Sequence, residues 1–202
     1  QGYIDLLDRW GKEDKEVLEE SIETIKIESI NMKQLLEQLL FLARGDKEEY
    51  KFELESVAFH KLISQVYQET ELIDDDHQIG LVENEPVEIK AERKSIKQLL
   101  RIIIDNSLKY TESGGGITIN SEVGPEQVEI KITDTGQGIA PEDLDKIFNR
   151  FYRADESRNR ETGGAGLGLS IANWIVEEHD GELEVDSELG AGTEVTIELP
   201  LN

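Results

Sequence analysis

The chain has 202 residues, 37% of them hydrophobic, and its formal net charge is −24. This length suits one large domain or one domain with an appendage, and no run approaches the roughly 18 to 20 apolar residues of a membrane-spanning helix. The absence of cysteine excludes disulfides and cysteine-based zinc sites, and the negative charge disfavours binding to a nucleic-acid backbone.

The N-terminal quarter of the chain is predicted to be helical. Residues 1–8 are typical of the end of a helix, and residues 9–14 form a polar turn. From about Lys15 to Arg44, seven positions are spaced alternately four and three residues apart: Leu18, Ile22, Ile25, Ser29, Met32, Leu36 and Leu39. This heptad spacing favours a long helix that packs in a bundle or dimer, and an amphipathic core helix is the alternative.

The pattern changes after a charged break at 45–49, where we expect a boundary between domains 1–47 and 48–202. Apolar residues at helical spacing predict helices at 62–67 and 96–108. Alternation of apolar and polar residues predicts the strands, at 52–55, 117–119, 128–132, 183–185 and 195–199. Because the strands have one polar face, we expect an α+β fold in which helices cover the other face of a mixed sheet.

Four segments of the second domain have residues suited to binding chemistry, and the first is 105–110. Asn106 and Lys109 are three residues apart and so share a helix face. An amide oxygen is a hard ligand suited to Mg²⁺, and a lysine beside it can reach a phosphate oxygen. Taken alone, the segment also fits an ordinary polar helix end.

The second segment, 134–139, follows an alternating strand and reads Asp134-Thr135-Gly136-Gln137-Gly138-Ile139. The two glycines let the backbone turn and let a ligand approach. A carboxylate at the strand end can accept a hydrogen bond from the exocyclic amine of adenine, whereas guanine has a carbonyl there. The segment favours ATP over GTP, although a simple turn would have the same pattern.

The third segment, 148–153, has apolar anchors and leads into a charged stretch that can close over a ligand as a lid. Four arginines fall within eleven residues that contain only two acids: Arg150, Arg153, Arg158 and Arg160. A polyphosphate ligand would explain such a cationic patch in an acidic protein. Arg153 is the candidate for neutralising a terminal phosphate, and a surface helix with a solvated loop is the alternative.

The fourth segment, 163–170, is glycine-rich and precedes a helix predicted at 171–178. A loop of this kind presents free N–H groups and the positive end of a helix dipole to phosphate. It lacks the lysine of a Walker loop and does not open the βαβ unit of a dinucleotide fingerprint.

In this order and spacing, the four segments resemble the N, G1, F and G2 boxes of sensor histidine kinases. The string 190–193 is similar to the glycine box that follows, and 39–44 is similar to the end of the second helix of the family's dimerisation domain. The resemblance therefore covers essentially the whole chain. It implies a Bergerat-type ATP-binding fold, a two-layer α/β sandwich, preceded by a long helix of a helical-hairpin dimerisation domain.

The resemblance also implies roles for individual residues. Asn106 would hold Mg²⁺, and Lys109 and Arg153 would contact the phosphates as catalytic cations. Tyr110 would lie beside the adenine, and Asp134 would bind its amino group. The remaining pocket residues implied are Thr193, which would support Asp134 through water, and Gly136, Gly138, Ile139, Gly164, Gly166, Leu167 and Gly168.

Two features depart from the family pattern. Ile102 stands four residues before Asn106, where many members have a second asparagine or an acid. The phosphoacceptor string, a histidine with an acid and then a proline, is absent, and the three histidines are expected to be structural: His60, His77 and His179. We expect the acceptor to lie upstream of Gln1, so the chain would bind Mg-ATP without phosphorylating itself.

The implied function is transfer of the γ-phosphate of ATP to a histidine, for relay to the receiver domain of a response regulator. The parent protein would be a membrane-anchored homodimer, of which this chain is a cytoplasmic portion, and nucleic acid would not be a partner. Two alternatives remain: a related ATPase or serine kinase of the same fold, and a non-catalytic nucleotide-sensing or dimerising module.

Overall fold

The computed structural model describes residues 15–45, 52–154 and 165–201. The chain divides into two compact units, Gln1–Tyr50 and Lys51–Asn202, which are described separately. The helix end predicted at 1–8 lies outside the described residues, as does nearly all of the predicted boundary at 45–49.

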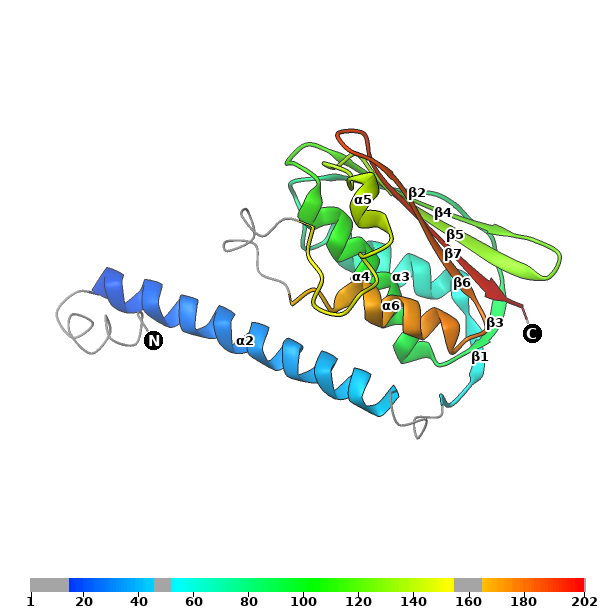
Figure 1. Ribbon diagram of the computed structural model, residues 1–202, viewed down its shortest axis with the longest axis horizontal. Coiled ribbons are helices and arrows are strands. Elements are labelled where there is room, and N and C mark those ends of the chain that lie inside the picture. Colours follow the sequence, from blue (N-terminus) through cyan, green and yellow to red (C-terminus); the bar gives the residue numbers. More distant parts are fainter. Residues whose placement is uncertain (1–14, 46–51, 155–164, 202) are drawn as a thin grey trace. The chain divides into compact units, whose positions relative to one another are not determined.

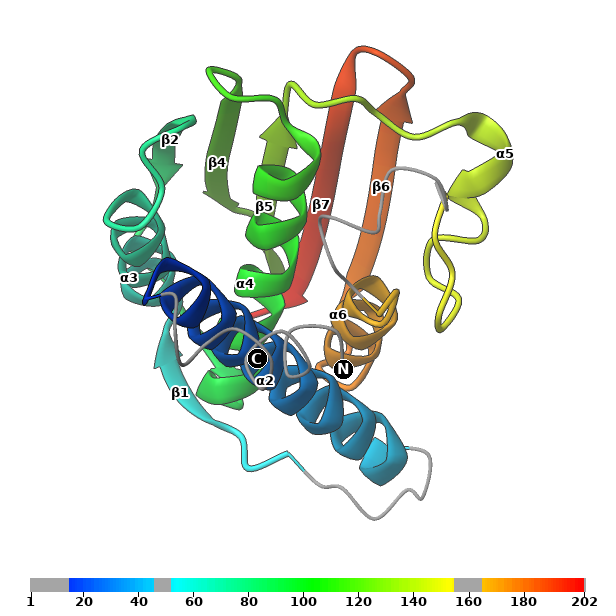
Figure 2. The same cartoon turned by 90° about the vertical axis from the view of Figure 1, so that its left-hand side faces the viewer.

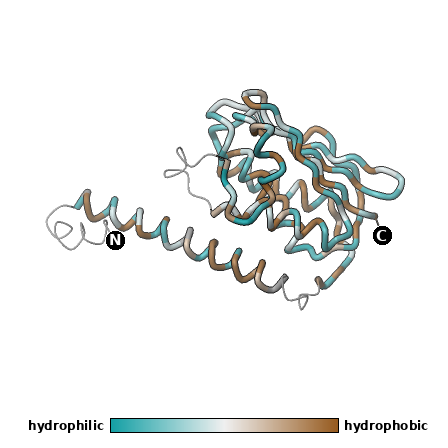
Figure 3. The backbone as a smooth tube through the Cα atoms, viewed as in Figure 1, coloured by the Kyte–Doolittle hydropathy of each residue, from teal (hydrophilic) through white to brown (hydrophobic). Residues whose placement is uncertain are grey.

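The first unit contains the long helix α2, Lys15–Gly45 (Figure 1). Between Lys15 and Arg44 the sequence contains no proline and no glycine, which favours an uninterrupted helix. Apolar residues recur along its length (Figure 3), and several on the predicted heptad seam are exposed, with Met32 71% and Leu36 58% accessible. The long helix predicted at 15–44 is thus present, with much of its apolar seam uncovered in the single chain.

The second unit is built on a five-stranded sheet with the order β2-β4-β5-β7-β6. Its first pair, β2 and β4, is parallel, and the other three pairs are antiparallel, which makes the sheet mixed. The strand bounds are Gln78–Asn84 for β2, Gly116–Val123 for β4, Gln127–Asp134 for β5, Glu182–Glu188 for β6 and Gly192–Pro200 for β7. The strands β1, Glu55–Ala58, and β3, Glu88–Ala91, form a separate antiparallel pair.

Three helices cover one face of the five-stranded sheet: α3 (Phe59–Glu71), α4 (Arg93–Tyr110) and α6 (Gly168–Glu177). Figure 2 shows them on the same side of the strands. A short helix, α5, spans Pro141–Leu144. The core consists of the apolar helix faces and every second strand residue, including Ile103, Ile104, Ile117, Ile119, Ile130, Ile132 and Ile197. The predicted α+β sandwich is therefore confirmed.

The prediction of a strand at 52–55 is wrong. Residues 52–54 have no regular structure, and the strand occupies Glu55–Ala58 instead. The ring of Phe52 lies 5.3 Å from that of Trp174 and 4.8 Å from that of His179, between centroids. Leu54 is exposed. Phe52 is therefore an aromatic contact of α6 rather than a strand residue, and the apparent alternation with the two glutamates is coincidental.

One further difference concerns the start of a helix. The helix predicted to begin at Ile171 begins at Gly168, so the last glycine of the fourth segment is its first residue. In the described ranges, no helix combines the length and the apolar composition needed to cross a bilayer.

Candidate functional site

A cavity of about 130 Å³ is lined by α4, β6, β7, the loop after β5 and the segments on both sides of residues 155–164. Seven predicted site residues line it: Asn106, Tyr110, Asp134, Gly138, Ile139, Arg153 and Thr193. Five others are not part of the lining: Lys109, Gly136, Gly166, Leu167 and Gly168. Gly164 lies outside the described residues. The fold thus brings together predicted residues from three of the four segments, and the fourth segment contributes Leu169.

Asp134 is the polar centre of this lining. It is the last residue of β5 and only 6% exposed. Its Oδ1 accepts hydrogen bonds from the backbone N–H of Gly136, at 2.9 Å, and of Thr193, at 3.1 Å. Its Oδ2 accepts no hydrogen bond from the described residues. Asp134 lines the cavity, and Oδ2 is not among the fully buried unpaired atoms, so Oδ2 is an acceptor available to a ligand.

The loop after β5 is fastened on two sides. The N–H of Gln137 donates to the carbonyl of Tyr110 at 3.0 Å, and the N–H of Gly190 donates to the carbonyl of Gln137 at 2.7 Å. Gly138 has a φ of +69°, and a Cβ there would lie 2.0 Å from the carbonyl oxygen of Glu188. Only glycine allows this turn and this approach to the β6–β7 hairpin.

Ser187 connects the hairpin to the same loop. Its Oγ accepts from the N–H of Ile139 at 2.9 Å, donates to the carbonyl of Gly192 at 2.8 Å and lies 2.9 Å from Oγ1 of Thr193. The Thr193 side chain therefore pairs with Ser187, while its backbone N–H bonds directly to Asp134. The support of Asp134, expected to pass through water, includes a direct backbone hydrogen bond.

The end of α4 meets the start of α6 beside the cavity. A Cβ at Gly168 would lie 4.0 Å from Nδ2 of Asn106 and 3.2 Å from Cγ2 of Ile102. The ammonium of Lys109 lies 4.9 Å from the centre of the Tyr110 ring, which is a cation–π distance. Ile102 thus gives an apolar contact to the α6 terminus, next to the amide that is the candidate metal ligand.

A backbone hydrogen bond joins the described residues on either side of 155–164. The N–H of Phe151 donates to the carbonyl of Gly166 at 2.8 Å, and Phe151 adopts a φ of +65°. The hydroxyl of Tyr152 donates to Asp143 at 2.5 Å, and this hydrogen bond raises the pKa of Tyr152 above 10.0. Arg153, beside Tyr152, lines the cavity. Most of the predicted lid lies outside the described residues.

Leu167 and the three histidines make hydrogen bonds that hold the fold together. Leu167, one of the pocket residues that the resemblance implies, is fully buried just before α6, where its carbonyl accepts from Ser170 Oγ at 2.8 Å. Nε2 of His179 accepts from the backbone N–H of Glu92 at 3.1 Å. All three histidines bond to backbone groups of other elements, as expected for structural residues: His60, His77 and His179.

Sequence reasoning missed much of the cavity wall. The missed lining residues are Ile103, Ser107, Gln137, Ile147, Tyr152, Ala154, Leu169, Val185 and Val195. Val185 and Val195 are register partners on β6 and β7, and their alternation marked them as inward-facing. The pattern does not indicate which inward residues border a cavity, because that depends on where the helices end.

Comparison with known protein families gives one match. Residues 91–202 match the family described as histidine kinase-, DNA gyrase B- and HSP90-like ATPase. This range includes every described site residue named above.

Individual proteins are similar over most of the chain. Sensor histidine kinase YkoH of Bacillus subtilis is 41% identical over 98% of this chain and 43% of its own length. Signal transduction histidine-protein kinase ArlS of Staphylococcus aureus is 39% identical over 98% of this chain and 44% of its own length. The chain therefore spans less than half of these curated relatives. The solved structure of full-length ShkA in complex with AMPPNP has a TM-score of 0.73 and 26% identity, over 90% of this chain and 39% of that one.

Proposed function

The chain belongs to the family of histidine kinase-, DNA gyrase B- and HSP90-like ATPases, and from that premise we propose that it is the ATP-binding kinase core of a sensor histidine kinase. The proposed reaction is transfer of the γ-phosphate of ATP to a histidine, for relay to the receiver domain of a response regulator. The observation that carries the proposal is the Asp134 carboxylate, whose Oδ1 is fixed by two backbone donors while Oδ2 remains available.

The Asp134 carboxylate suits adenine because it is an acceptor fixed in a largely apolar wall. The exocyclic amine of adenine can donate to Oδ2, with the purine between the Tyr110 side chain and the valines of β6 and β7. Guanine would present a carbonyl to the same oxygen, so that neither its carbonyl oxygen nor Oδ2 of Asp134 would have a donor. Loss of a hydrogen-bond partner in a buried site gives strong discrimination, so we propose ATP rather than GTP as the ligand.

The triphosphate would extend from the adenine toward Asn106, Lys109 and Arg153. Among the described residues, no group of three or more His, Cys, Asp or Glu side chains could hold a metal. Mg²⁺ commonly binds with few protein ligands, keeping water and substrate phosphate oxygens. The amide of Asn106 fits such a site, and we propose it as the protein ligand. Bound Mg²⁺ would neutralise phosphate charge, as Lys109 and Arg153 also would.

The start of α6 would complete the phosphate site. Helix N-termini have free N–H groups and a positive dipole end that favour anions. The helix α6 begins at Gly168, where a Cβ would lie 4.0 Å from Nδ2 of Asn106, so the helix start is near that amide. These groups position and neutralise the phosphates, which is most of what phosphoryl transfer requires of a protein. The acceptor histidine would come from another segment, because the three histidines here hold backbone groups.

The long helix suggests how such an acceptor would be presented. We propose that α2 is part of a helical dimerisation domain and that its seam pairs with other helices in a homodimer of the membrane-anchored parent protein. Met32 and Leu36 are more than half exposed, and exposed apolar stripes of this kind mark interaction surfaces. Sedimentation analysis should detect self-association of the chain that Leu36→Glu weakens. A monomer at all concentrations would contradict this part of the proposal.

Phosphotransfer in trans tests the kinase function. The chain would be incubated with γ-labelled ATP, Mg²⁺ and a separate acceptor domain that carries the histidine of a curated relative. Acid-labile label on that domain is the expected result, and Asp134→Asn should abolish it. Acid-stable label on a hydroxyl would indicate the related serine kinase. Nucleotide binding without any label would indicate a non-catalytic module.

A further inference from the structure

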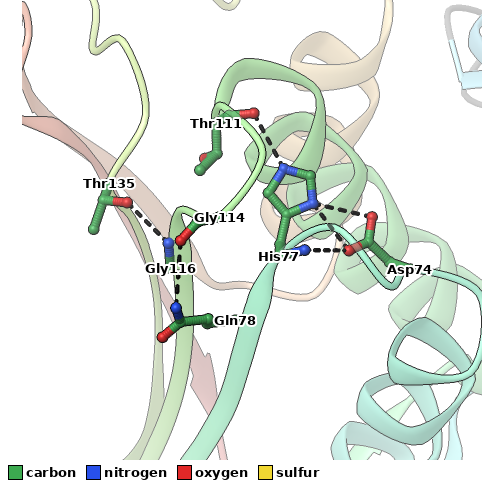
Figure 4. Close-up of polar contacts among 7 residues, drawn as sticks. All are labelled: Asp74, His77, Gln78, Thr111, Gly114, Gly116 and Thr135. Atoms are coloured by element: carbon green, nitrogen blue, oxygen red, sulfur yellow. Dashed lines mark hydrogen bonds and ion pairs between the residues drawn. The ribbon is translucent and has the colours of Figure 1, made fainter.

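His77 joins the loop after α3 to the C-terminal end of α4 (Figure 4). Its Nδ1 lies 2.9 and 3.0 Å from the two carboxylate oxygens of Asp74, and its Nε2 lies 3.1 Å from the backbone carbonyl oxygen of Thr111. The backbone N–H of His77 also donates to Asp74 at 2.9 Å. Both ring nitrogens therefore face hydrogen-bond acceptors.

This geometry selects one protonation state of the ring. A neutral imidazole has one N–H and one lone pair, so it can satisfy only one of two acceptors. The imidazolium has two N–H groups and satisfies both. Burial acts to lower the pKa of His77, but the hydrogen bonds to Asp74 and Thr111 and the charges of Asp74 and Asp76 outweigh it and raise the pKa above 6.5.

The same pair shifts the aspartate. Burial acts to raise the pKa of Asp74, but hydrogen bonds from the side chain and backbone of His77 outweigh it and lower the pKa below 3.8. From the α4 side, the ring meets the uncharged carbonyl of Thr111, and the titratable neighbours of Thr111 in sequence are Tyr110 and Glu112. The ion pair of His77 with Asp74 is thus the main charge interaction at this contact.

The contact with Thr111 leads directly to the candidate site. Thr111 follows Tyr110, and its N–H makes the last hydrogen bond of α4, to the carbonyl of Ser107 at 3.1 Å. Tyr110 and Ser107 both line the cavity. The carbonyl of Tyr110 also accepts from Gln137 in the loop after β5. A shift of the Thr111 carbonyl would therefore move the ring and the carbonyl of Tyr110 with it.

A second connection runs from the same loop to Asp134. The N–H of Gln78 donates to the carbonyl of Gly115 at 2.8 Å, and Gly116 exchanges two hydrogen bonds with Thr135, at 2.9 and 3.0 Å. Figure 4 shows Gln78, Gly116 and Thr135, with a hydrogen bond between Gly116 and Thr135 drawn as a dashed line. Thr135 follows Asp134 in the chain. Tyr110 is thus one residue from Thr111, which bonds to His77 directly, whereas Asp134 is connected to Gln78 indirectly, through Thr135, Gly116 and Gly115.

We propose that His77, as the imidazolium, is a positioning residue of the nucleotide site, because its two N–H groups hold the end of α4, where Tyr110 lies, against the loop between α3 and β2. This inference rests on the proposed function. When His77 loses its proton, one ring nitrogen presents a lone pair to an acceptor and that contact is lost. Affinity for an adenine nucleotide therefore falls as the pH rises through the pKa of His77. By linkage, bound nucleotide raises the pKa of His77.

The test is an NMR titration of the His77 ring in the chain, with and without AMPPNP, beside calorimetric affinities over the same pH range. We expect a higher His77 pKa in the bound chain. From the acidic to the alkaline limit, the affinity of both chains falls, and the factor for the wild type should exceed that for His77→Gln by at least about fivefold. Fivefold is the lower end of the couplings usually found between two sites. Titration of the nucleotide phosphates affects the wild type and His77→Gln alike. The difference between their two pH profiles therefore reports the contribution of His77.

Two further variants keep the result interpretable. His60→Gln removes another half-buried histidine that bonds to a backbone group, at Val87, and should keep the wild-type pH dependence. Asp74→Asn preserves the shape of the contact but removes its charge, so the fall in affinity should move to lower pH, even if His77→Gln does not fold. An unchanged His77 pKa on binding, or the same pH dependence in His77→Gln, would overturn the inference. Absence of binding at every pH would instead overturn the nucleotide site itself.

Discussion

The backbone N–H of Thr193 donates to Oδ1 of Asp134 at 3.1 Å, although the two residues are 59 positions apart in sequence. They are also register partners of β7 and β5, at the ends of adjacent strands. Strand pairing therefore sets the orientation of the carboxylate before a ligand arrives. A fixed acceptor needs little reordering on binding, which is the advantage of a preorganised site.

Replacing Asp134 with asparagine should remove nucleotide binding while the fold survives. The backbone N–H groups of Gly136 and Thr193 hold one oxygen, so the amide nitrogen would face the ligand and present a donor to the adenine amine. We expect a loss of at least about 100-fold in affinity, as for other unpaired groups in a binding site. Calorimetry with AMPPNP measures it.

Glu129→Gln is the matched control, because it removes a carboxylate from the same strand at a position that pairs with Lys131 away from the cavity. It should bind nucleotide as the wild type does. An Asp134→Asn chain with wild-type affinity would contradict the assigned role of the carboxylate.

Gly138→Ala should destabilise the second unit and impair the loop that carries Gln137 and Ile139. At a φ of +69° an alanine is strained, and its Cβ would meet the carbonyl oxygen of Glu188. The free energy of unfolding in urea should fall by at least about 1–2 kcal/mol. Gly80→Ala is the control, since nothing lies within 4 Å of its Cβ position, and it should change stability by less than about 0.5 kcal/mol. Equal effects of both variants would refute the argument.

Acid should break a bridge between α3 and α4. Hydrogen bonds from Lys97 first, and also from Gln65 and Arg101, lower the pKa of Glu69 from 4.5 to about 2. A carboxylate whose pKa is lower in the folded chain contributes stability that is present above the unfolded pKa and lost as pH falls through the folded pKa. Glu69→Gln should therefore lower the melting temperature near neutral pH. As the pH falls from 4.5 to 2, the melting temperature of this variant should fall less than that of the wild type.

Melting curves of the wild type and Glu69→Gln across that pH range measure the difference. Glu53→Gln, at an exposed residue outside the helices and strands, is the control and should follow the wild-type curve. Parallel curves for the wild type and Glu69→Gln would rule out the bridge as a source of acid sensitivity.

Charge reversal on the polar face of the sheet should stabilise the fold. Glu198 on β7 is the register partner of both Glu129 on β5 and Glu182 on β6. Like charges directly opposite each other are unfavourable, so Glu198→Lys should add about 0.2–1 kcal/mol to the free energy of unfolding. Added salt should shrink the gain by screening. Glu53→Lys makes the same charge change off the sheet, and an equal gain there would point to net charge alone.

Secondary structure could be predicted from the sequence in segments where one physical rule dominates. Alternation in 117–132 and 183–199 predicts strands because one face is buried, and the apolar stripe from Ile96 to Leu108 predicts α4. The glycine positions predict the hairpin and the loop after β5 because few other residues fit there. Seven of the site residues expected from the motifs and from the family resemblance line one cavity.

Other features depend on pairing that no local pattern encodes. The strand β2 carries a register shift between Leu81 and Asn84, so its alternation is broken and its sequence does not look like a strand. Ser187 enters the site only because β6 aligns it with Thr193. The importance of His77 likewise follows from where α4 ends, since its partners Asp74 and Thr111 are 3 and 34 positions away.

A crystal soaked with a nonhydrolysable ATP analogue and Mg²⁺ tests the central claim most directly. The structure predicts that the adenine amine lies at a hydrogen-bond distance of about 3 Å from Oδ2 of Asp134, with the phosphates toward Asn106 and the start of α6. An analogue bound elsewhere, or a cavity left empty at saturating concentration, would contradict it.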